Sequence, residues 1–144
     1  MGQINLAVDV MGGDKGPATT IEGVYKASKI YPSVNFRLFG NKPLVLKEIE
    51  RFKSFENFEL FHTDQVVRSN DGPVEALRKL KKSSLRLAIN DVHEKKSDGL
   101  VSAGNTGALM AISKFVLKTI PGISRPAIAG LMPTMRGENI ILDL

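Results

Sequence analysis

The 144-residue sequence contains no cysteine, and aromatic residues make up only 6% of it. Without cysteine the chain cannot provide a thiolate nucleophile, a cysteine metal ligand or a disulfide. Few aromatic residues and no recognised nucleic-acid-binding motif argue against a nucleic-acid partner. No apolar run approaches the ~20 residues of a membrane-spanning helix, because Lys114 and Lys118 interrupt the apolar segment 107–120.

The N-terminus has no basic stretch followed by an apolar segment, so we expect no secretory signal. Apolar residues make up 42% of the chain and charged residues 24%, as in ordinary globular domains. The length suits a single domain with a real core. A net charge of +5 fits either an acidic partner or a generally basic proteome.

Strand-like and helix-like segments alternate along the chain. Strand patterns cover 4–10, 36–40, 58–62, 99–102, 127–132 and 139–144, and helical patterns cover 18–31, 43–51, 73–95 (one helix or a pair) and 106–118. This alternation predicts an α/β fold with a parallel sheet covered by helices. In such sheets the functional loops follow the strands, yet the sequence ends on a strand pattern. We therefore expect residues 1–144 to form one α/β domain that is the N-terminal portion of a longer fold.

The first candidate site is the loop that follows the first strand pattern, with Asp9, Gly12, Gly13 and Asp14. Ligands bind at this end of the strands in doubly wound sheets, and glycines let the backbone approach a ligand closely. The two carboxylates can orient a ligand or a basic side chain. The alternative is a tight turn with a helix-capping aspartate. The dinucleotide-binding pattern G-x-G-x-x-G is absent.

The second candidate site is the small-residue loop 102–107, which lies between a strand and a helix. Helix N-termini attract anions through free N–H groups and the helix dipole. Ser102, Asn105 and Thr106 add polar groups, while Gly104 and Gly107 leave room for a phosphate. An Asn or Thr cap on a buried helix is the alternative, but a cap accounts for only one of these polar residues.

The third candidate is the basic segment 71–86, which contains Arg78 and Lys81 and then Ser83 and Ser84. These residues can meet phosphate or an acidic protein surface, although charge runs are most often a solvated helix face. His62 closes a strand pattern and can act as a general base; His93 is expected to face solvent. No spacing of His, Asp or Glu resembles a metal site.

Two further pairs, Arg125-Pro126 and Pro133-Thr134, are expected in loops beside the strand at 127–132. They can line the same cleft or form simple turns.

Several runs together resemble one protein family. They are Val8 to Asp14, Asp71 to Pro73, Ala76, Arg78, Lys81 to Ser84, Val101 to Met110, Arg125 to Ala129, Pro133-Thr134 and Leu142-Asp143. In this order and spacing they resemble the phosphate acyltransferase family of bacterial phospholipid synthesis. The run Ser-Ala-Gly-Asn-Thr-Gly-Ala is its most specific part.

The resemblance implies a three-layer α/β sandwich related to the phosphate acetyltransferase and isocitrate dehydrogenase folds. It implies transfer of an acyl group from acyl carrier protein to inorganic phosphate in lipid biosynthesis, with no metal and no cofactor. It also implies a cytoplasmic homodimer with peripheral membrane association. Asn105, Thr106 and Asp9 are then the candidate catalytic residues. The candidate phosphate- or substrate-binding residues are Gly12, Gly13, Asp14, Ser102, Gly104, Gly107, Arg78, Lys81, Ser83 and Ser84.

Members of this family are about twice as long or longer, so the resemblance implies that a C-terminal half is missing here. We therefore expect the isolated chain to be inactive or weakly active. Two other hypotheses remain: a short-chain phosphate acetyltransferase that uses acyl-CoA, and a non-catalytic product of a truncated gene.

Overall fold

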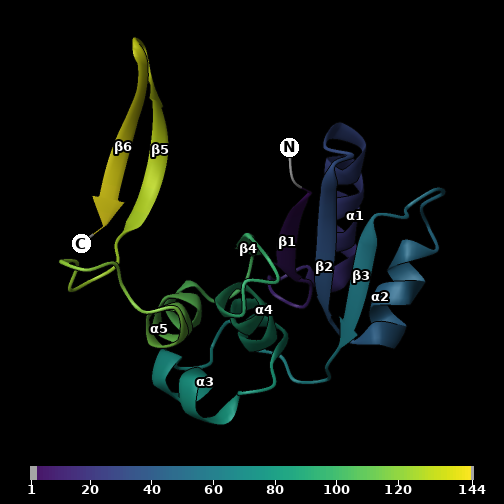
Figure 1. Cartoon of the computed structure of the whole chain (residues 1–144), viewed down its shortest axis with the longest axis horizontal. Helices are drawn as coiled ribbons and strands as arrows, with labels where there is room; N and C mark the ends of the chain where they lie inside the picture. Colours follow the sequence, from purple (N-terminus) through teal and green to yellow (C-terminus); the bar gives the residue numbers. More distant parts are fainter. Residues whose placement is uncertain (1–2, 144) are drawn as a thin grey trace.

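The computed structural model describes residues 3–143, which form five helices and six strands (Figure 1). The strands are β1 (Ile4–Asp9), β2 (Val34–Gly40), β3 (Phe58–His62), β4 (Gly99–Ser102), β5 (Ile128–Thr134) and β6 (Gly137–Asp143), and the helices are α1 (Gly16–Ile30), α2 (Lys42–Ile49), α3 (Pro73–Lys79), α4 (Ser84–His93) and α5 (Thr106–Val116). The predicted alternation of strands and helices is confirmed, and the helical pattern at 73–95 forms a pair. Leu144, within the last predicted strand, lies outside the described residues.

Strands β1 to β4 form a parallel sheet in the order β3-β2-β1-β4. Because all four strands run the same way, their C-terminal ends lie along one edge of the sheet. In this register Asp9 is the partner of Ser102. The loops that follow β1 and β4, which hold the first two candidate sites, therefore start side by side.

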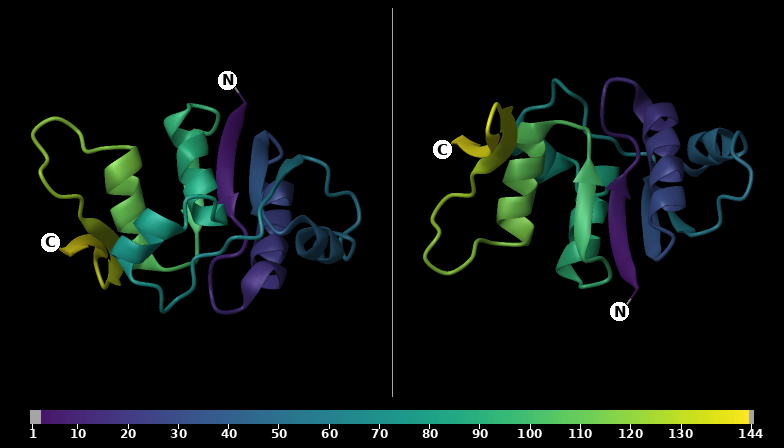
Figure 2. Two further views of the ribbon diagram at one scale, coloured as in Figure 1. Left: turned by 90° about the horizontal axis from the view of Figure 1, so that it is seen from below. Right: turned by 90° about the horizontal axis from the view of Figure 1, so that it is seen from above.

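Alternating side chains along β1 and β2 face two different helical layers. Val8 and Leu38 belong to one apolar cluster with Ile21 of α1, whereas Ala7 and Phe39 pack with Ala88 of α4. Both views in Figure 2 show α1 and α4 on opposite sides of β1. The α/β sandwich expected from the sequence is confirmed. It follows from the period of two along a strand, which gives each face its own apolar set.

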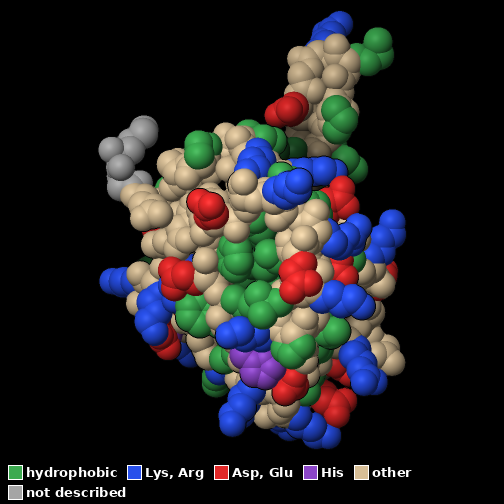
Figure 3. Space-filling view, turned by 90° about the vertical axis from the view of Figure 1, so that its right-hand side faces the viewer, with side chains coloured by type: hydrophobic (Ala, Val, Ile, Leu, Met, Phe, Trp, Pro, Cys, Tyr) green, Lys and Arg blue, Asp and Glu red, His purple; other side chains and the backbone are tan. Residues whose placement is uncertain are grey.

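Helices α3 and α5 extend the layer that contains α4. Leu85 and Ile89 of α4 pack with Ile112 of α5 and Ala76 of α3 in a further buried cluster. On the other side of the molecule, around α2 and β3, Figure 3 shows Lys and Arg side chains interspersed with Asp and Glu.

The last two strands do not join the sheet. β5 and β6 pair with each other in an antiparallel hairpin, which projects away from the other elements (Figure 1). The turn between them is too short for a parallel connection, which needs a dozen or more residues. Pro133 and Thr134 were expected in a loop, but they lie within β5, so that expectation is wrong. Arg125 and Pro126 do precede β5 in an irregular segment.

Candidate functional site

The loops after β1 and β4 touch through their backbones. A Cβ atom built on Gly12 would lie 2.9 Å from the backbone nitrogen of Gly104 and 2.6 Å from Oδ2 of Asp9. Real Cβ atoms do not approach other atoms so closely, so only glycine fits at this position. The pairing of the two candidate loops therefore depends on Gly12.

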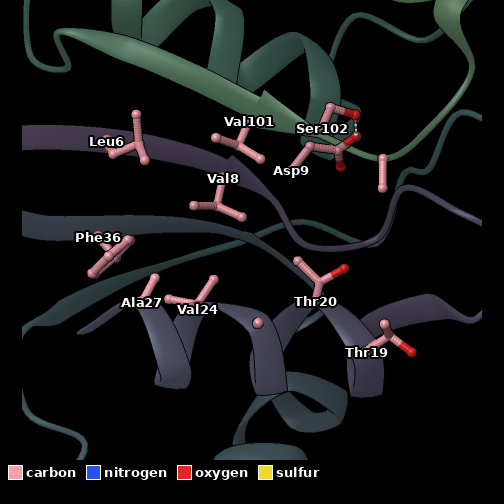
Figure 4. A pocket seen from close by; sticks show the side chains of 12 residues that line it. Leu6, Val8, Asp9, Thr19, Thr20, Val24, Ala27, Phe36, Val101 and Ser102 are labelled. Atoms are coloured by element: carbon pink, nitrogen blue, oxygen red, sulfur yellow. Dashed lines mark hydrogen bonds between the residues drawn. The ribbon is translucent and has the colours of Figure 1, made fainter. Parts of the chain in front are cut away.

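Asp9 lies beneath both loops and joins three elements. Its Oδ1 accepts a hydrogen bond from Ser84 Oγ at the start of α4 (2.6 Å), and its Oδ2 accepts one from Ser102 Oγ at the end of β4 (2.8 Å). The backbone nitrogen of Gly104 in turn donates to Ser102 Oγ (3.1 Å). This chain of hydrogen bonds fixes the position of the second loop relative to the first; Figure 4 shows the bond between Asp9 and Ser102.

The carboxyl group of Asp9 is only 2% exposed. Burial raises its pKa above the ordinary value of 3.8, although hydrogen bonds from Ser84, from Ser102 and from the backbone of Met11 and Gly12 act in the opposite direction. A carboxylate so enclosed offers almost no surface to a ligand. Its position is that of a support for the loops.

The oxygen and the nitrogen of the Asn105 side-chain amide both form hydrogen bonds with backbone groups. Its Oδ1 accepts from the backbone nitrogen of Ala108 (2.9 Å) and so caps α5. Its Nδ2 donates to the carbonyl oxygens of Arg68, Ser69 and Asp71 at 2.9–3.2 Å. The side chain thereby holds the segment 68–71 against the start of α5. The cap that the sequence offered as an alternative is the observed contact of Asn105.

Gly107 lies where α3 packs on α5. A Cβ atom at this position would lie 2.9 Å from Cγ of Pro73, the first residue of α3. Its lack of a side chain is therefore explained by helix packing. Thr106, just before it, is exposed at the first position of α5.

The serines of the third candidate are inside the protein. Ser83 is 0% exposed; its hydroxyl donates to the carbonyl of Leu80 and accepts from the backbone nitrogen of Arg86, which caps α4. Ser84 is also buried and binds Asp9. Arg78 and Lys81 are exposed and line a separate hollow away from the glycine loops. The structure thus divides this segment into a buried support and a basic surface.

Two small hollows open at the glycine loops. One, of about 240 Å³, lies between Gly12-Gly13 and the first turn of α1, where Lys15, Thr19 and Thr20 line it. The other, of about 300 Å³, is bordered by Gly104, Arg68 and Ser69. Asp14 stands between them and accepts a hydrogen bond from Ser69 Oγ (3.1 Å). The exposed groups of the site are therefore backbone amides, hydroxyls, two basic residues and the carboxylate of Asp14.

The N-terminus of α1 differs from those of the other long helices near this edge. Side chains cap α4 (Ser83) and α5 (Asn105), whereas Lys15, the residue before α1, makes no side-chain cap. No side chain caps α1, but the Gly16 N–H donates to the carbonyl oxygen of Gly13 (3.3 Å) and Pro17 has no N–H, so few amides of the first turn remain free beside the hollow at Gly12-Gly13. The positive end of the α1 dipole and the adjacent Lys15 still attract negative charge, so an anion fits this hollow better than the capped starts of α4 and α5.

Sequence analysis did not find four of these residues. Thr19 and Thr20 fall inside the predicted helix 18–31, and their position at its first turn, directly after the glycine loop, is the signal that could have marked them. Arg68 and Ser69 lie between β3 and α3 without any motif. Only the hydrogen bonds from Asn105 and the contact with Asp14 bring them to the site.

An apolar hollow of about 300 Å³ lies next to the polar loops, between α1 and β4 (Figure 4). Leu6, Val8, Val24, Phe36 and Val101 form its walls, and Ser102 and Ala103 border it near the loops. Val101 is 50% exposed, because β4 is the edge strand and α1 does not extend over it. A hydrocarbon group can therefore lie directly beside the glycine loops.

His62 has a local role. Its Nδ1 accepts a hydrogen bond from the backbone nitrogen of Lys42 at the start of α2 (3.1 Å), on the side of the sheet away from β4. Within residues 3–143, no cluster of His, Asp and Glu is arranged to hold a metal ion. None of the helices in that range is long and apolar enough to cross a membrane.

Comparison with known proteins matches the whole described fold to one family. The family model described as "Fatty acid synthesis protein" covers residues 4–144. The chain belongs to this family. Curated relatives named phosphate acyltransferase include those of Hydrogenovibrio crunogenus and Magnetococcus marinus (each 46% identical over 142 residues, 98% of this chain) and of Shewanella woodyi (45% identical over 147 residues, 100% of this chain).

The resemblance to phosphate acyltransferases is confirmed by these matches. The chain spans 42%, 41% and 43% of the length of the three relatives. More than half of the length of each relative therefore lies outside the match.

Proposed function

We propose that this chain is part of an enzyme that transfers an acyl group to inorganic phosphate and so forms acyl-phosphate. The observation that carries the proposal is the contact between the two glycine loops at the C-terminal edge of the sheet, in a chain similar to phosphate acyltransferases over its whole length. That edge is where parallel α/β sheets bind ligands.

The reaction needs positioning more than it needs a protein nucleophile. A phosphate oxygen attacks the carbonyl carbon of an acyl thioester, the carbon–sulfur bond breaks, and the thiol leaves with a proton. Catalysis then consists of holding a dianion against the carbonyl and stabilising the developing oxyanion. The lack of cysteine is compatible with this chemistry.

In this proposal phosphate binds in the hollow between Gly12-Gly13 and the start of α1. Support comes from the positive end of the α1 dipole, which no side chain caps, and from Lys15, Thr19 and Thr20 beside it. The loop Ser102 to Gly104, with Arg68 nearby, faces the carbonyl oxygen. The apolar hollow between α1 and β4 receives the first carbons of the acyl group.

In this proposal four residues position the loops and do not contact the substrate, because their polar groups already bind one another or the backbone. They are Asp9, Ser84, Ser102 and Asn105. Thr106 is exposed at the start of α5 and remains a candidate for direct contact with substrate, as the sequence suggested.

The donor, the biological role, the oligomeric state and the cellular location in this proposal rest on the family resemblance. They are an acyl carrier protein as the donor, a role in phospholipid synthesis, a homodimer, and a cytoplasmic enzyme that associates peripherally with the membrane. Each concerns the whole enzyme, of which this chain is one part.

The first test is phosphate binding by Gly12→Ala, measured by isothermal titration with inorganic phosphate. The added Cβ would displace Gly104 and break the loop contact, so we expect affinity to fall at least about tenfold. Gly130→Ala is the matched control, because a Cβ on Gly130 of β5 comes no closer than 4.0 Å to another atom and the hairpin projects away from the glycine loops (Figure 1). Equal affinity in both variants would contradict the site.

The transfer reaction is tested in a chimera that joins residues 1–144 to the unmatched part of the Hydrogenovibrio crunogenus relative. We expect it to form acyl-phosphate from acyl carrier protein and phosphate, and the Gly12→Ala chimera to lose about a hundredfold in rate. A donor exchange for acetyl-CoA separates this function from a short-chain acetyltransferase. Faster turnover of acetyl-CoA would reject the carrier-protein donor.

A further inference from the structure

A hollow of about 570 Å³ lies on α3, the turn after it, α4 and α5, apart from the glycine loops. Leu77, Arg78, Lys81, Arg86 and Phe115 line it, and we call it the basic hollow. Three of its five residues are cations and none is acidic. Phe115 leaves 56% of its surface exposed there.

Two cations lie over the ring of Phe115. The guanidinium carbon of Arg86 is 5.9 Å from the ring centroid, and Nζ of Lys118 is 5.0 Å from it. Attraction between a cation and the face of an aromatic ring compensates only weakly at an exposed site. The positive charges of Arg86 and Lys118 therefore lie close together at the ring without being neutralised.

These cations have no carboxylate partner within residues 3–143. Salt bridges in that range involve Lys26, Arg37, Arg51, His62, Lys79 and Lys96. Arg78, Lys81, Arg86 and Lys118 are not among them. On the side of the molecule around α2 and β3, by contrast, Lys and Arg are interspersed with Asp and Glu (Figure 3).

We propose that the basic hollow docks an acidic segment of a protein partner. Carboxylates of the partner pair with Arg78, Lys81, Arg86 and Lys118, and one apolar side chain packs on Leu77 and Phe115. An exposed aromatic surrounded by unpaired cations has the composition of a protein interface, with an apolar centre and a charged rim. The inference rests on the proposed function in one respect: the acyl donor proposed there is an acidic carrier protein.

The shape of the hollow favours a protein over a membrane or a nucleic acid. Membrane-binding surfaces insert apolar side chains into the lipid, whereas here Phe115 lines a concavity together with Leu77. Single-stranded nucleic acids stack successive bases on several aromatic side chains, whereas Phe115 is the single aromatic residue among those that line the hollow.

The position of the hollow connects it to the candidate site. Arg86 lies on the first turn of α4, two residues after Ser84, whose hydroxyl binds Asp9 under the glycine loops. α3 begins at Pro73, which packs against Gly107 near the start of α5. A partner bound in the hollow thus rests on the same three helices whose N-termini support the site.

Fluorescence anisotropy of labelled acyl carrier protein titrated with the 144-residue chain tests the docking directly. We expect the double reversal Arg78→Glu with Arg86→Glu to weaken binding at least about tenfold. Phe115→Ser leaves the net charge unchanged and is expected to weaken binding about fivefold through the lost apolar contact. Far-UV circular dichroism checks that each variant is folded.

The matched control is Lys47→Glu with Lys53→Glu, on α2 and in the segment that follows it. It changes the net charge by the same amount at exposed positions away from the hollow, and we expect binding within about twofold of wild type. If both double variants lost the same affinity for carrier protein, the loss would come from the change in net charge alone, and the proposal would be overturned. An absence of binding by the wild-type chain would overturn it as well.

Vesicles of an anionic phospholipid provide the third arm. If the Arg78/Arg86 double variant loses vesicle binding but keeps carrier-protein binding, the hollow faces lipid and the proposal is wrong. Failure of the docking and failure of the proposed function are distinguishable. If the chimera is active and the Arg78/Arg86 variant keeps its affinity for carrier protein, only the docking proposal is rejected. If the Arg78/Arg86 variant loses carrier-protein binding but the chimera is inactive, only the proposed acyl transfer is rejected.

Discussion

At the scale of single residues, the carboxylate of Asp9 shows how position changes the meaning of a motif. From sequence it looked like a group that meets a ligand. In the structure it is buried and accepts hydrogen bonds from two serines that belong to different elements. A buried charge of this kind is tolerated because donors surround it. Its contribution to function is therefore the geometry of the loops above it.

The pH dependence of stability reports on Asp9. Burial raises its pKa in the native state above the ordinary 3.8, so ionisation costs the folded protein more than the unfolded chain. The stability linked to this group is fully present below the unfolded pKa and is lost as pH rises through the native pKa. We expect the wild-type free energy of unfolding to fall relative to that of Asp9→Asn as pH rises from about 4.

Urea denaturation of both proteins across a pH series measures this difference. A wild-type-to-variant difference that stays constant with pH would show that Asp9 titrates normally. Asp98→Asn is a suitable control, since Asp98 is an exposed aspartate at the opposite end of β1.

At the scale of elements, an ion pair joins the sheet to α4. Arg37 of β2 donates from Nε and Nη2 to the two carboxylate oxygens of Asp91, at 2.8 and 3.1 Å, and Ser97 Oγ donates to the same carboxylate. The side chains of Arg37 and Asp91 are only 13% and 7% exposed. This two-bond geometry fixes how α4 lies on the sheet, and hence where Ser84 meets Asp9.

Asp91→Asn is expected to destabilise the protein by about 3 kcal/mol at neutral pH, because it leaves a largely buried guanidinium without its main partner. Burial alone would raise the pKa of Asp91, but hydrogen bonds from Arg37 and Ser97 and the charge of Arg37 outweigh it, so the pKa is lowered. The pair's contribution is present above the ordinary pKa and is lost as pH falls through the native value. The difference between the two proteins should therefore shrink in acid.

Glu59→Gln is the control for Asp91→Asn in the same urea measurements. Glu59 pairs with the same arginine at 2.7 Å, but its side chain is 50% exposed, so we expect a loss of at most about 1 kcal/mol. Equal losses in the two variants would mean that burial does not distinguish the two pairs.

At the scale of the whole molecule, the β5–β6 hairpin stands apart from the sandwich. Every residue of β5 is exposed, and large apolar side chains such as Leu131 and Ile140 lie on its surface. Within the described part of the chain, β4 likewise has no strand beside it on its outer side. Exposed apolar strands and open sheet edges favour association with other chains.

Leu131 and Ile140 are direct cross-strand partners, so their side chains lie on the same face of the hairpin. Leu131→Glu with Ile140→Lys replaces an apolar pair by an ion pair and keeps the net charge. We expect wild type to self-associate with rising concentration in analytical ultracentrifugation and this double variant to do so less. Leu131→Val with Ile140→Val keeps the apolar surface and should behave as wild type; loss of association there as well would contradict this reading.

Much of the fold could be predicted because its signals are local. The helix starts at Pro73 and Asn105 follow from proline geometry and capping, and the sheet follows from alternating strand and helix patterns. The split of 73–95 into two helices stayed open in the sequence. The placement of 128–143 was not predicted, because pairing depends on which strands are available rather than on the strand pattern itself.

The sequence by itself determined the family, the α/β class and the two glycine loops, because glycine, proline and capping residues act through their immediate neighbours. Only the tertiary structure decided which polar groups remain free for a ligand. Asp9, Ser84 and Asn105 are engaged by residues up to 93 positions away in sequence, whereas Lys15, Thr19 and Arg68 line the hollows at the loops. A hydrogen bond between distant segments exists only once the chain has folded, so no local pattern can assign it.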